Sequence, residues 1–391
     1  MVEPVETSSS RAPWNIRAAP PVVLNVQAFD VIVIGAGQAG LSAAHHLRRV
    51  AAGDLLVLDA DERPGGAWQH RWDSLTMHDV HGIAALPGMP LPAHDPSDPA
   101  NVVVPAYFEA YERAFDLPVR RPVTVSSVEP VDDEPDGPLL VRTDSGDLVT
   151  RSLVNATGTW TVPFVPHYPG METFRGRQLH TVGYAGPEDL AGLRVVVVGG
   201  GASAVQILGE LAPVAETVWV TRREPVWRSG PFDQEAGRAA VALVEERVAR
   251  GLPPQSVVGV TGLMLRPQER AAAELGAYRR RPMFARVEPD GVRWADGSFA
   301  AADVIIWATG FRPAVSHLAP LRLRGPRGGV PLLAPFDRHT YTTAARDGRV
   351  HFVGYGPSAS TIGANRAGHA AARAVVRQLA ESSDRAYAVA N

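Results

Sequence analysis

The sequence predicts an α/β fold built from two Rossmann-like dinucleotide-binding domains, because a strand, a glycine-rich turn, a helix and a second strand follow one another twice. The first copy leads from the apolar residues 30–34 into Gly35-Ala-Gly-Gln-Ala-Gly40. The second leads from residues 193–198 into Gly199-Gly-Gly-Ala-Ser-Ala204. Since units of this kind form parallel sheets covered by helices, we expect two such sheets.

The pattern after each turn has the same order in both copies. A helical pattern at 41–50 precedes an apolar strand at 55–58 in the first copy, and a helix at 205–211 precedes a strand at 218–220 in the second. Residues 233–285 contain a helical pattern at about 235–250 and no motif that assigns the rest.

Two more apolar strands end in Ala-Thr-Gly, at 153–158 and at 304–310, and each is predicted to close the unit that precedes it. A return segment follows, with a strand at 350–353 and a helix at about 363–379. The chain therefore re-enters the first unit after completing the second, which predicts that the second domain is inserted into the first.

Composition narrows the possible partners and chemistry. The chain has 391 residues, a net charge of −3, no cysteine and no lysine. We therefore expect no nucleic-acid or membrane partner, no disulfide, no thiolate or Schiff-base catalysis and no metal site. Residues 1–27 are expected to form a flexible N-terminal arm without the apolar core of a signal peptide, and a cytoplasmic location follows from that expectation.

The first turn fits the pyrophosphate of a dinucleotide. Gly35 permits the tight turn, Gly37 lets the phosphate approach the backbone, and Gly40 lets the helix pack on the strand. Asp59 closes the next strand, about 20 residues after Gly40, where a carboxylate accepts hydrogen bonds from ribose hydroxyls and repels a 2′-phosphate. This pattern indicates FAD.

The second turn differs at the strand end. Gly199 and Gly201 again permit phosphate binding, but Arg222 and Arg223 stand where the first unit has its acid. Guanidinium groups bind phosphate through charge-assisted hydrogen bonds, so this end predicts recognition of the NADPH 2′-phosphate. The predicted domains are an FAD-binding domain at 28–188 and 311–391 and an NADPH-binding domain at 189–310.

The segment ahead of the second turn carries a family resemblance. Phe174, Gly176, His180 and Tyr184 match the fingerprint FxGxxxHxxx[YF], and the sequence is similar in this respect to the flavin-containing monooxygenases, the class B flavoprotein monooxygenases. The resemblance implies that His180 couples NADPH binding to the arrangement of the domains, with hinge packing as the alternative role.

Other segments agree with the resemblance. Gly65-Gly66-Ala-Trp68 resembles the family's loop beside the flavin, and residues 354–366 resemble the closing FAD segment. Residues 75–78 together with 86–90 resemble the segment that crosses near the isoalloxazine, where His78 is a candidate polar group. The residues that the turns and the resemblance assign to cofactor binding are Gly35, Gly37, Gln38, Gly40, Asp59, Gly66, Trp68, Gly199, Gly201, Ser203, Arg222, Arg223, Gly354, Thr361 and Ile362. The catalytic candidates are His78 and His180.

The resemblance implies an NADPH-dependent FAD monooxygenase that activates O2 as a C4a-(hydro)peroxyflavin and oxygenates a nitrogen, a sulfur or a ketone of a small organic substrate. One alternative is an NADPH-dependent flavoprotein reductase that passes electrons to a quinone, a metal ion or a carrier. A second is a non-catalytic FAD- and NADPH-binding sensor. Disulfide reductases share the two-domain plan but need a redox cysteine pair, which a chain without cysteine lacks. No motif indicates the substrate or the oligomeric state.

Overall fold

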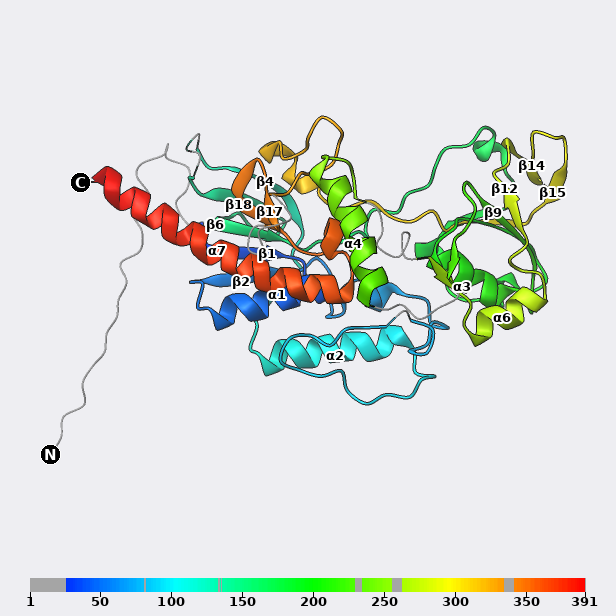
Figure 1. Ribbon diagram of the computed structural model, residues 1–391, viewed down its shortest axis with the longest axis horizontal. Helices are drawn as coiled ribbons and strands as arrows, with labels where there is room; N and C mark the ends of the chain where they lie inside the picture. The colour runs from blue at the N-terminus through cyan, green and yellow to red at the C-terminus, as the bar shows by residue number, and fades with distance from the viewer. Residues whose placement is uncertain are drawn as a thin grey trace.

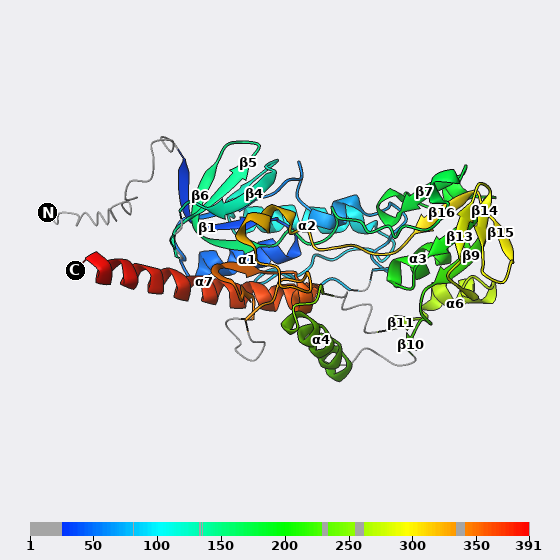
Figure 2. The same ribbon diagram turned by 90° about the horizontal axis from the view of Figure 1, so that it is seen from above.

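A computed structural model describes residues 26–80, 82–132, 134, 136–228, 234–254, 262–333 and 341–390. The predicted N-terminal arm lies outside this set except for its last two residues. The described chain forms two lobes, the first built on a mixed sheet with a parallel centre and the second on a parallel sheet (Figure 1). The first lobe holds both the early strands and the C-terminal helix, and the second lies beyond it along the long axis of the molecule (Figure 2).

The first lobe contains an eight-stranded sheet. Its main path runs in the order β17-β18-β6-β1-β2-β3, and the stretch from β18 to β3 is parallel throughout. An antiparallel pair, β4 and β5, extends from β6. The strands are β1 (Gln27–Ile34), β2 (Leu55–Leu58), β3 (Val119–Arg120), β4 (Val125–Pro130), β5 (Leu139–Thr143), β6 (Leu148–Asn155), β17 (Thr343–Ala344) and β18 (Asp347–Phe352).

The second half of strand β1, Val31–Ile34, is buried on both faces, as its unbroken run of apolar residues predicts for a parallel sheet. Val31 and Val33 belong to the core shared with the helices of this lobe, whereas Ile32 and Ile34 belong to the core on the opposite face. Helix α1 (Gln38–Arg49) packs beside the long helix α7 (Thr361–Ala390), and α2 (Ala100–Ala114) packs on the same core. The helices α1 and α7 approach closely, because a Cβ on Gly368 would lie 2.5 Å from Oγ of Ser42.

The second lobe contains a five-stranded parallel sheet in the order β12-β9-β8-β16-β7. Helix α3 (Ala202–Leu211) follows β8, and α6 (Pro267–Glu274) packs on α3. The strands are β7 (Arg177–His180), β8 (Arg194–Val198), β9 (Glu216–Thr221), β12 (Arg280–Pro282) and β16 (Val304–Trp307). A small antiparallel sheet adjoins them, formed by β13 (Arg286–Glu288), β14 (Gly291–Arg293) and β15 (Phe299–Ala301).

The structure differs from the predicted domain boundaries in two places. Strand β7 lies before residue 189 yet pairs with β16 in the second sheet. Helix α4 (Gln234–Ala249) lies within 189–310 yet packs on the first lobe, where Val248 joins the core that holds Ile32 and Tyr355. Sequence order alone does not reveal either placement, because both depend on which apolar face finds a partner in three dimensions.

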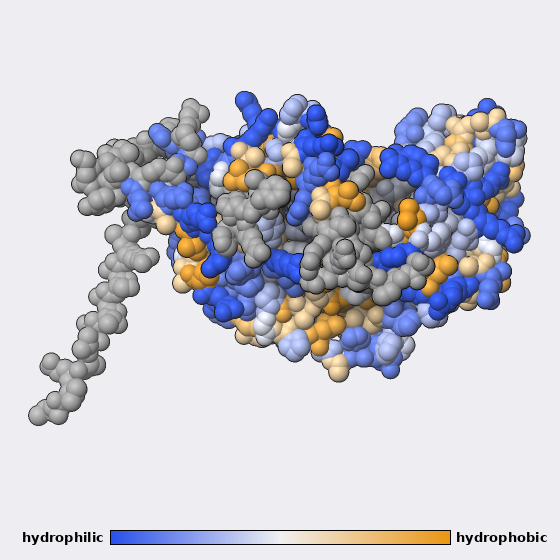
Figure 3. Space-filling model, in the orientation of Figure 1, coloured by the Kyte–Doolittle hydropathy of each residue, from blue (hydrophilic) through white to orange (hydrophobic). Residues whose placement is uncertain are grey.

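The remaining elements of the described chain are short strands and 3-10 helices. They are β10 (Trp227–Arg228), β11 (Leu263–Met264) and the 3-10 helices η1 (Gly66–His70), η2 (Met171–Thr173), η3 (Thr181–Gly183), η4 (Glu188–Leu190), η5 (Ser316–Leu321) and η6 (Gly356–Ser358). No helix in the described ranges is long and apolar enough to cross a membrane. Hydrophilic residues cover much of the face in Figure 3, with hydrophobic residues grouped along its lower middle edge over α2.

Candidate functional site

The first glycine-rich turn connects β1 to α1 and packs tightly against the backbone at the end of β6. Gly35 has φ of 101°, and a Cβ there would lie 2.6 Å from the carbonyl oxygen of Ala156. A Cβ on Gly40 would lie 1.7 Å from the carbonyl oxygen of Gly35. Both positions therefore require glycine, as the sequence predicted, and they bring the start of α1 directly above the end of β1.

The outer side of the same turn is open. A Cβ on Gly37 would meet only the Cα of Gly66, at 3.8 Å. Gly37 is the N-cap of α1 and provides no side-chain cap, and the first turn of α1 has no acidic residue. The first N–H groups of the helix are thus left for an anion, and the space at Gly37 fits the pyrophosphate of a dinucleotide.

Asp59 lies at the end of β2 and is buried. Its Oδ2 accepts a hydrogen bond of 2.5 Å from the N–H of Ala36, and its Oδ1 accepts one of 2.9 Å from the N–H of Asp61. Burial raises the pKa of this carboxyl, and the two backbone hydrogen bonds oppose that rise. Asp59 therefore braces the glycine-rich turn itself while keeping further acceptor capacity for ribose hydroxyls.

Gln38 joins the start of α1 to the start of α7. Its Nε2 donates to Oδ1 of Asn365 at 3.0 Å and to the carbonyl of Ala84 at 3.2 Å, while its Oε1 is buried without a partner. Thr361 Oγ1 accepts from the N–H of Ala84. A buried amide oxygen without a donor fits a site that a cofactor completes.

The other predicted residues of the closing segment lie around the same place. Gly354 has φ of 76°, and a Cβ there would lie 3.1 Å from Cβ of Ala39 on α1. Ile362, in the first turn of α7, is 59% exposed. An exposed apolar side chain at a helix start beside the glycine-rich turn suits contact with a flat ring system.

The second glycine-rich turn repeats the design of the first. Gly199 has φ of 146°, and a Cβ there would lie 2.1 Å from the carbonyl oxygen of Ala308, which belongs to the second Ala-Thr-Gly segment as Ala156 belongs to the first. Gly201 has no atom within 4 Å of its Cβ position and caps α3 without a side-chain bond. Ser203 lies half-buried in the first turn of α3. We call each glycine-rich turn together with the helix start that follows it a cradle, the first at Gly35–Gly40 and the second at Gly199–Ala204. The second cradle, like the first, fits a pyrophosphate.

The strand end of the second unit is rich in arginine. Arg222 and Arg223 are exposed just after β9. Arg280, on the neighbouring strand β12, donates from Nε to Oγ1 of Thr221 at 2.7 Å and forms an ion pair of 2.7 Å with Glu224. Arg280 was not found from the sequence, since it is distant in the chain and reaches this end only through the parallel pairing of β9 with β12.

Two segments run side by side where the chain crosses between the lobes, and we call residues 157–164 and 309–314 the crossing. Phe164 donates its N–H to the carbonyl of Gly310, and Arg312 donates to that of Val162. His180 joins the crossing, because its Nε2 lies 2.9 Å from the carbonyl oxygen of Gly310 and its Nδ1 accepts from the N–H of Val182. Burial lowers the pKa of His180. With both ring nitrogens engaged, this neutral imidazole is suited to hinge packing more than to proton transfer.

An aromatic cluster surrounds the crossing. We define it as His70, Trp160 and Phe311. The Trp160 ring stacks on that of Phe311 at 5.1 Å and on that of His70 at 6.2 Å, and His180 meets Phe311 edge-on at 4.9 Å. Trp68, in η1 after Gly66, packs on the core of the first lobe. The cluster therefore gathers side chains from η1 and from both segments of the crossing, and it contacts His180 of the fingerprint.

Glu210 was not found from the sequence, yet it connects the two lobes. Its carboxylate on α3 accepts hydrogen bonds from Trp72 Nε1 at 2.8 Å, Ser74 Oγ at 2.6 Å and the Tyr184 hydroxyl at 2.9 Å. Burial raises the pKa of Glu210, although these donors oppose that rise. We call these four residues the interdomain latch. Tyr184 is the one residue of the latch that belongs to the fingerprint, so it is the one that the sequence marked for attention.

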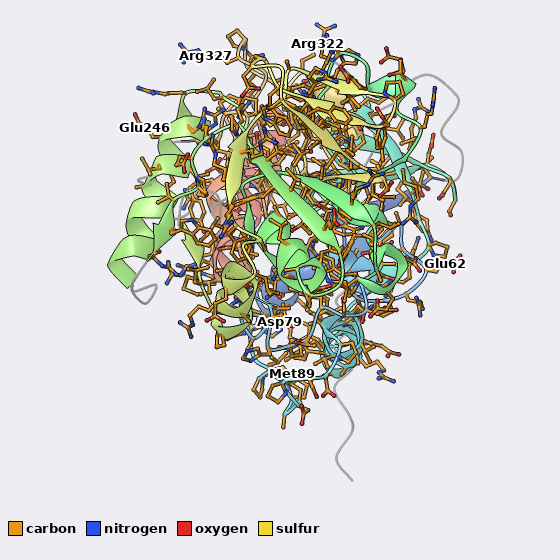
Figure 4. The ribbon with its side chains drawn as sticks, turned by 90° about the vertical axis from the view of Figure 1, so that its right-hand side faces the viewer. Glu62, Asp79, Met89, Glu246, Arg322 and Arg327 are labelled. Atoms are coloured by element: carbon orange, nitrogen blue, oxygen red, sulfur yellow. The ribbon has the colours of Figure 1, made fainter. Side chains whose placement is uncertain are left out.

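The loop that supplies Trp72 and Ser74 also accepts hydrogen bonds from the second lobe at Asp79. Gln206 of α3 donates to the carbonyl of Asp79 at 2.8 Å, and Arg266, beside α6, donates to the same oxygen. Figure 4 shows Asp79 at the foot of these helices. His78, the other catalytic candidate, precedes it with an exposed side chain. Nowhere in the described ranges do three or more His, Cys, Asp or Glu residues gather as a metal site.

Comparisons with known proteins agree with this geometry. The profile of the family described as pyridine nucleotide-disulphide oxidoreductase matches residues 32–252. The structure of the flavin-containing monooxygenase from Stenotrophomonas maltophilia superposes with a TM-score of 0.75 at 37% identity, covering 92% of this chain and 100% of that chain. An indole-3-pyruvate monooxygenase of Oryza sativa is 32% identical over 328 residues, or 73% of this chain and 77% of that protein.

The chain belongs to the flavin-containing monooxygenase family. It is a flavin-dependent monooxygenase, and the cofactors of this enzyme family are FAD and NADPH. The bacillithiol disulfide reductase from Bacillus cereus shares the fold, with a TM-score of 0.64 at 16% identity over 90% of this chain and 99% of that chain. The enzyme has no cysteine, so it has no disulfide of its own to cycle.

Proposed function

We propose that this enzyme transfers one atom of O2 to a nucleophilic sulfur or nitrogen of a small organic molecule and consumes one NADPH in each turnover. The observation that carries the proposal is the contrast between the two cradles, because Asp59 ends the strand of the first and Arg222 and Arg223 end that of the second. A carboxylate favours ribose hydroxyls, whereas guanidinium groups favour a 2′-phosphate. The contrast supports FAD at the first cradle and NADPH at the second.

Several residues are suited to hold FAD in the first lobe. The start of α1 at Gly37 would take the pyrophosphate, and Asp59 the ribose of the adenosine half. Gln38 Oε1, which is buried without a partner, would accept a donor of the cofactor, and Trp68 and the start of α7 at Thr361 would flank the flavin. When bound, FAD supplies hydride acceptance and O2 activation, chemistry for which the side chains of this cysteine-free chain have no substitute.

The second lobe would present NADPH to the first. Gly201 and Ser203 at the start of α3 would take its pyrophosphate, and Arg222 and Arg223 its 2′-phosphate. The interdomain latch, in which Trp72 and Ser74 of the first lobe donate to Glu210 of α3, would hold the two cradles relative to each other, so the protein's own contribution would be to orient both nucleotides. The small organic substrate named for the rice relative supports a substrate of that size.

With a thioether as substrate, the balanced reaction consumes the thioether, O2, NADPH and a proton. It yields the sulfoxide, NADP⁺ and water. The test uses the FAD-loaded enzyme with NADPH, methyl phenyl sulfide and ¹⁸O2. We expect sulfoxide that carries one ¹⁸O, formed with one NADPH oxidised per product. The readouts are mass spectrometry of the product and NADPH absorbance.

Other outcomes separate the rival functions. Rapid NADPH oxidation that reduces a quinone, with no labelled sulfoxide, would identify a reductase. FAD and NADPH binding with negligible turnover would identify a sensor. Labelled lactone from cyclohexanone, without sulfoxide, would place the chemistry on ketones.

A further inference from the structure

We propose that Arg71 and the two indoles beside it form an anion subsite at the crossing, which recognises a carboxylate on an otherwise apolar substrate. This inference rests on the proposed function and names the class of substrate for the same site. No acidic side chain in the described part of the chain forms an ion pair with Arg71.

Arg71 follows η1 and is half-buried, and its Nε is buried without a hydrogen-bond partner. Within the described ranges it forms no ion pair and no side-chain hydrogen bond, and its contacts are with rings. Burial lowers the pKa of Arg71 to about 10, so the group still carries its charge near neutral pH. An unpaired buried guanidinium is costly, which points to an acceptor that arrives from outside the chain.

The walls of the subsite are aromatic. The guanidinium carbon lies 4.5 Å from the ring centre of Trp160 and 5.7 Å from that of Trp68. Cation–π contact holds the guanidinium in place but satisfies none of its N–H donors. The fork of donors therefore remains available for a bidentate acceptor, for which a carboxylate has the matching geometry.

The carboxylate nearest in sequence is that of Asp73, and its Oδ1 accepts a hydrogen bond of 2.7 Å from Nδ2 of Asn101. Asp61 accepts from Gln69 Nε2 at 3.0 Å and pairs with His70 at 2.9 Å. Burial lowers the pKa of Arg71, and no acidic side chain among the described residues pairs with it. The subsite thus offers one positive charge between two half-buried indoles, which suits an aryl or alkyl carboxylate.

The position of the subsite connects it to the reaction. Trp68 follows Gly66, which packs against Gly37 of the first cradle. Trp160 stacks on Phe311, which contacts His180 of the fingerprint. Arg71 therefore lies between the two lobes, beside the segments suited to hold both nucleotides, and a carboxylate bound there would orient the rest of the substrate toward this centre.

The anion could be a substrate carboxylate or a cofactor phosphate, and the test separates them. Calorimetric titration of the FAD-loaded enzyme with benzoate and with benzamide measures the subsite directly. We expect benzoate to bind at least tenfold more tightly than benzamide, Arg71→Gln to remove the difference, and Arg71→Lys to keep part of it. Arg63→Gln, at an exposed arginine on the same loop, should match the wild type.

A matched activity test uses 4-(methylthio)benzoate and its methyl ester. We expect the wild type to favour the acid in kcat/KM and Arg71→Gln to accept both equally, with its FAD content and NADPH KM unchanged. The inference is overturned if the wild type treats benzoate and benzamide alike, if Arg71→Gln keeps the preference, or if that variant instead loses FAD or NADPH affinity, which would assign Arg71 to a cofactor phosphate. Failure to oxygenate either thioether would contradict the proposed function, and the benzoate titration would still decide the role of Arg71.

Discussion

Two exposed arginines after β9 set the expected nucleotide preference of the second cradle. Arg222→Ala and Arg223→Ala should each weaken NADPH binding by about 1.5–3 kcal/mol, the usual value of a hydrogen bond to a charged group, while NADH binding changes little because it lacks the 2′-phosphate. Steady-state KM values for both nucleotides provide the measurement. Arg270→Ala, at an exposed residue of α6, serves as the control. Equal losses for NADPH and NADH would reject the 2′-phosphate role.

Among single residues, the sequence predicts those whose role is fixed by their own turn or strand end. Gly35, Gly40 and Gly199 stand where their turns require glycine, because a Cβ would collide with backbone. The sequence does not predict Arg280 or Glu210, since each acquires its role from a partner brought by tertiary structure. Nor does it predict that Asp59 would bind the N–H of Ala36, which depends on how β2 ends beneath the turn.

The loop from Trp72 to Asp79 belongs to the first lobe and reaches α3 of the second lobe through its hydrogen bonds to Glu210 and Gln206. Its position therefore depends on the latch more than that of any other element. Tyr184→Phe removes one hydrogen bond to the half-buried Glu210 carboxylate, so we expect faster hydrogen exchange in this loop and a reduced kcat with FAD retained. The expected loss of unfolding free energy is about 1.5–3 kcal/mol, as for other bonds to charged groups. Exchange mass spectrometry and steady-state kinetics measure these effects.

The matched control is Tyr111→Phe, which also removes one buried hydroxyl bond, to the carbonyl of Pro87 within the first lobe. It should lower stability without changing exchange in the loop of Trp72. If both variants behave alike, the latch contributes stability only and does not position the lobes.

Element types were predicted better than element partners. The helix at about 235–250 and the strand ahead of Gly199 are both present, as α4 and β8. Their periodicity is local and can be read from the chain. The pairing of β7 with β16 and the packing of α4 on the first lobe were missed, because an apolar face does not specify which neighbour will cover it.

For the whole molecule, buried histidines predict acid sensitivity. Burial lowers the pKa of His351 to about 4 and that of His317 to about 4, from 6.5. The unfolded chain binds these protons near pH 6.5 while the folded chain does not, so their stabilisation is complete above pH 6.5 and is lost as pH falls toward 4. For His351 alone the loss between pH 7 and 5 is about 2 kcal/mol.

Denaturant unfolding at both pH values measures this loss in the wild type and in His351→Gln. The carboxyls of Asp59 and Glu210, whose pKa values are raised, act in the opposite direction, so the difference between the two proteins isolates the imidazole. His94→Gln, at an exposed histidine, is the control. An equal pH dependence in wild type and His351→Gln would refute this assignment.

The account of the whole molecule rests on two phosphate cradles of the same design, one in each lobe. Alanine fits the protein at the open glycine of either cradle, because a Cβ on Gly37 would meet only one atom, at 3.8 Å, and one on Gly201 would meet none within 4 Å. Any loss caused by these substitutions therefore reports the bound nucleotide rather than the fold. Gly348→Ala, with equally open space on β18, is the control.

The most direct measurement compares FAD content and NADPH affinity in these three variants. Gly37→Ala should lose FAD, whereas Gly201→Ala should retain FAD and bind NADPH about tenfold more weakly, a change of about 1.4 kcal/mol. Gly348→Ala should match the wild type in both. Full FAD content in Gly37→Ala together with unchanged NADPH affinity in Gly201→Ala would contradict the assignment of the two cradles.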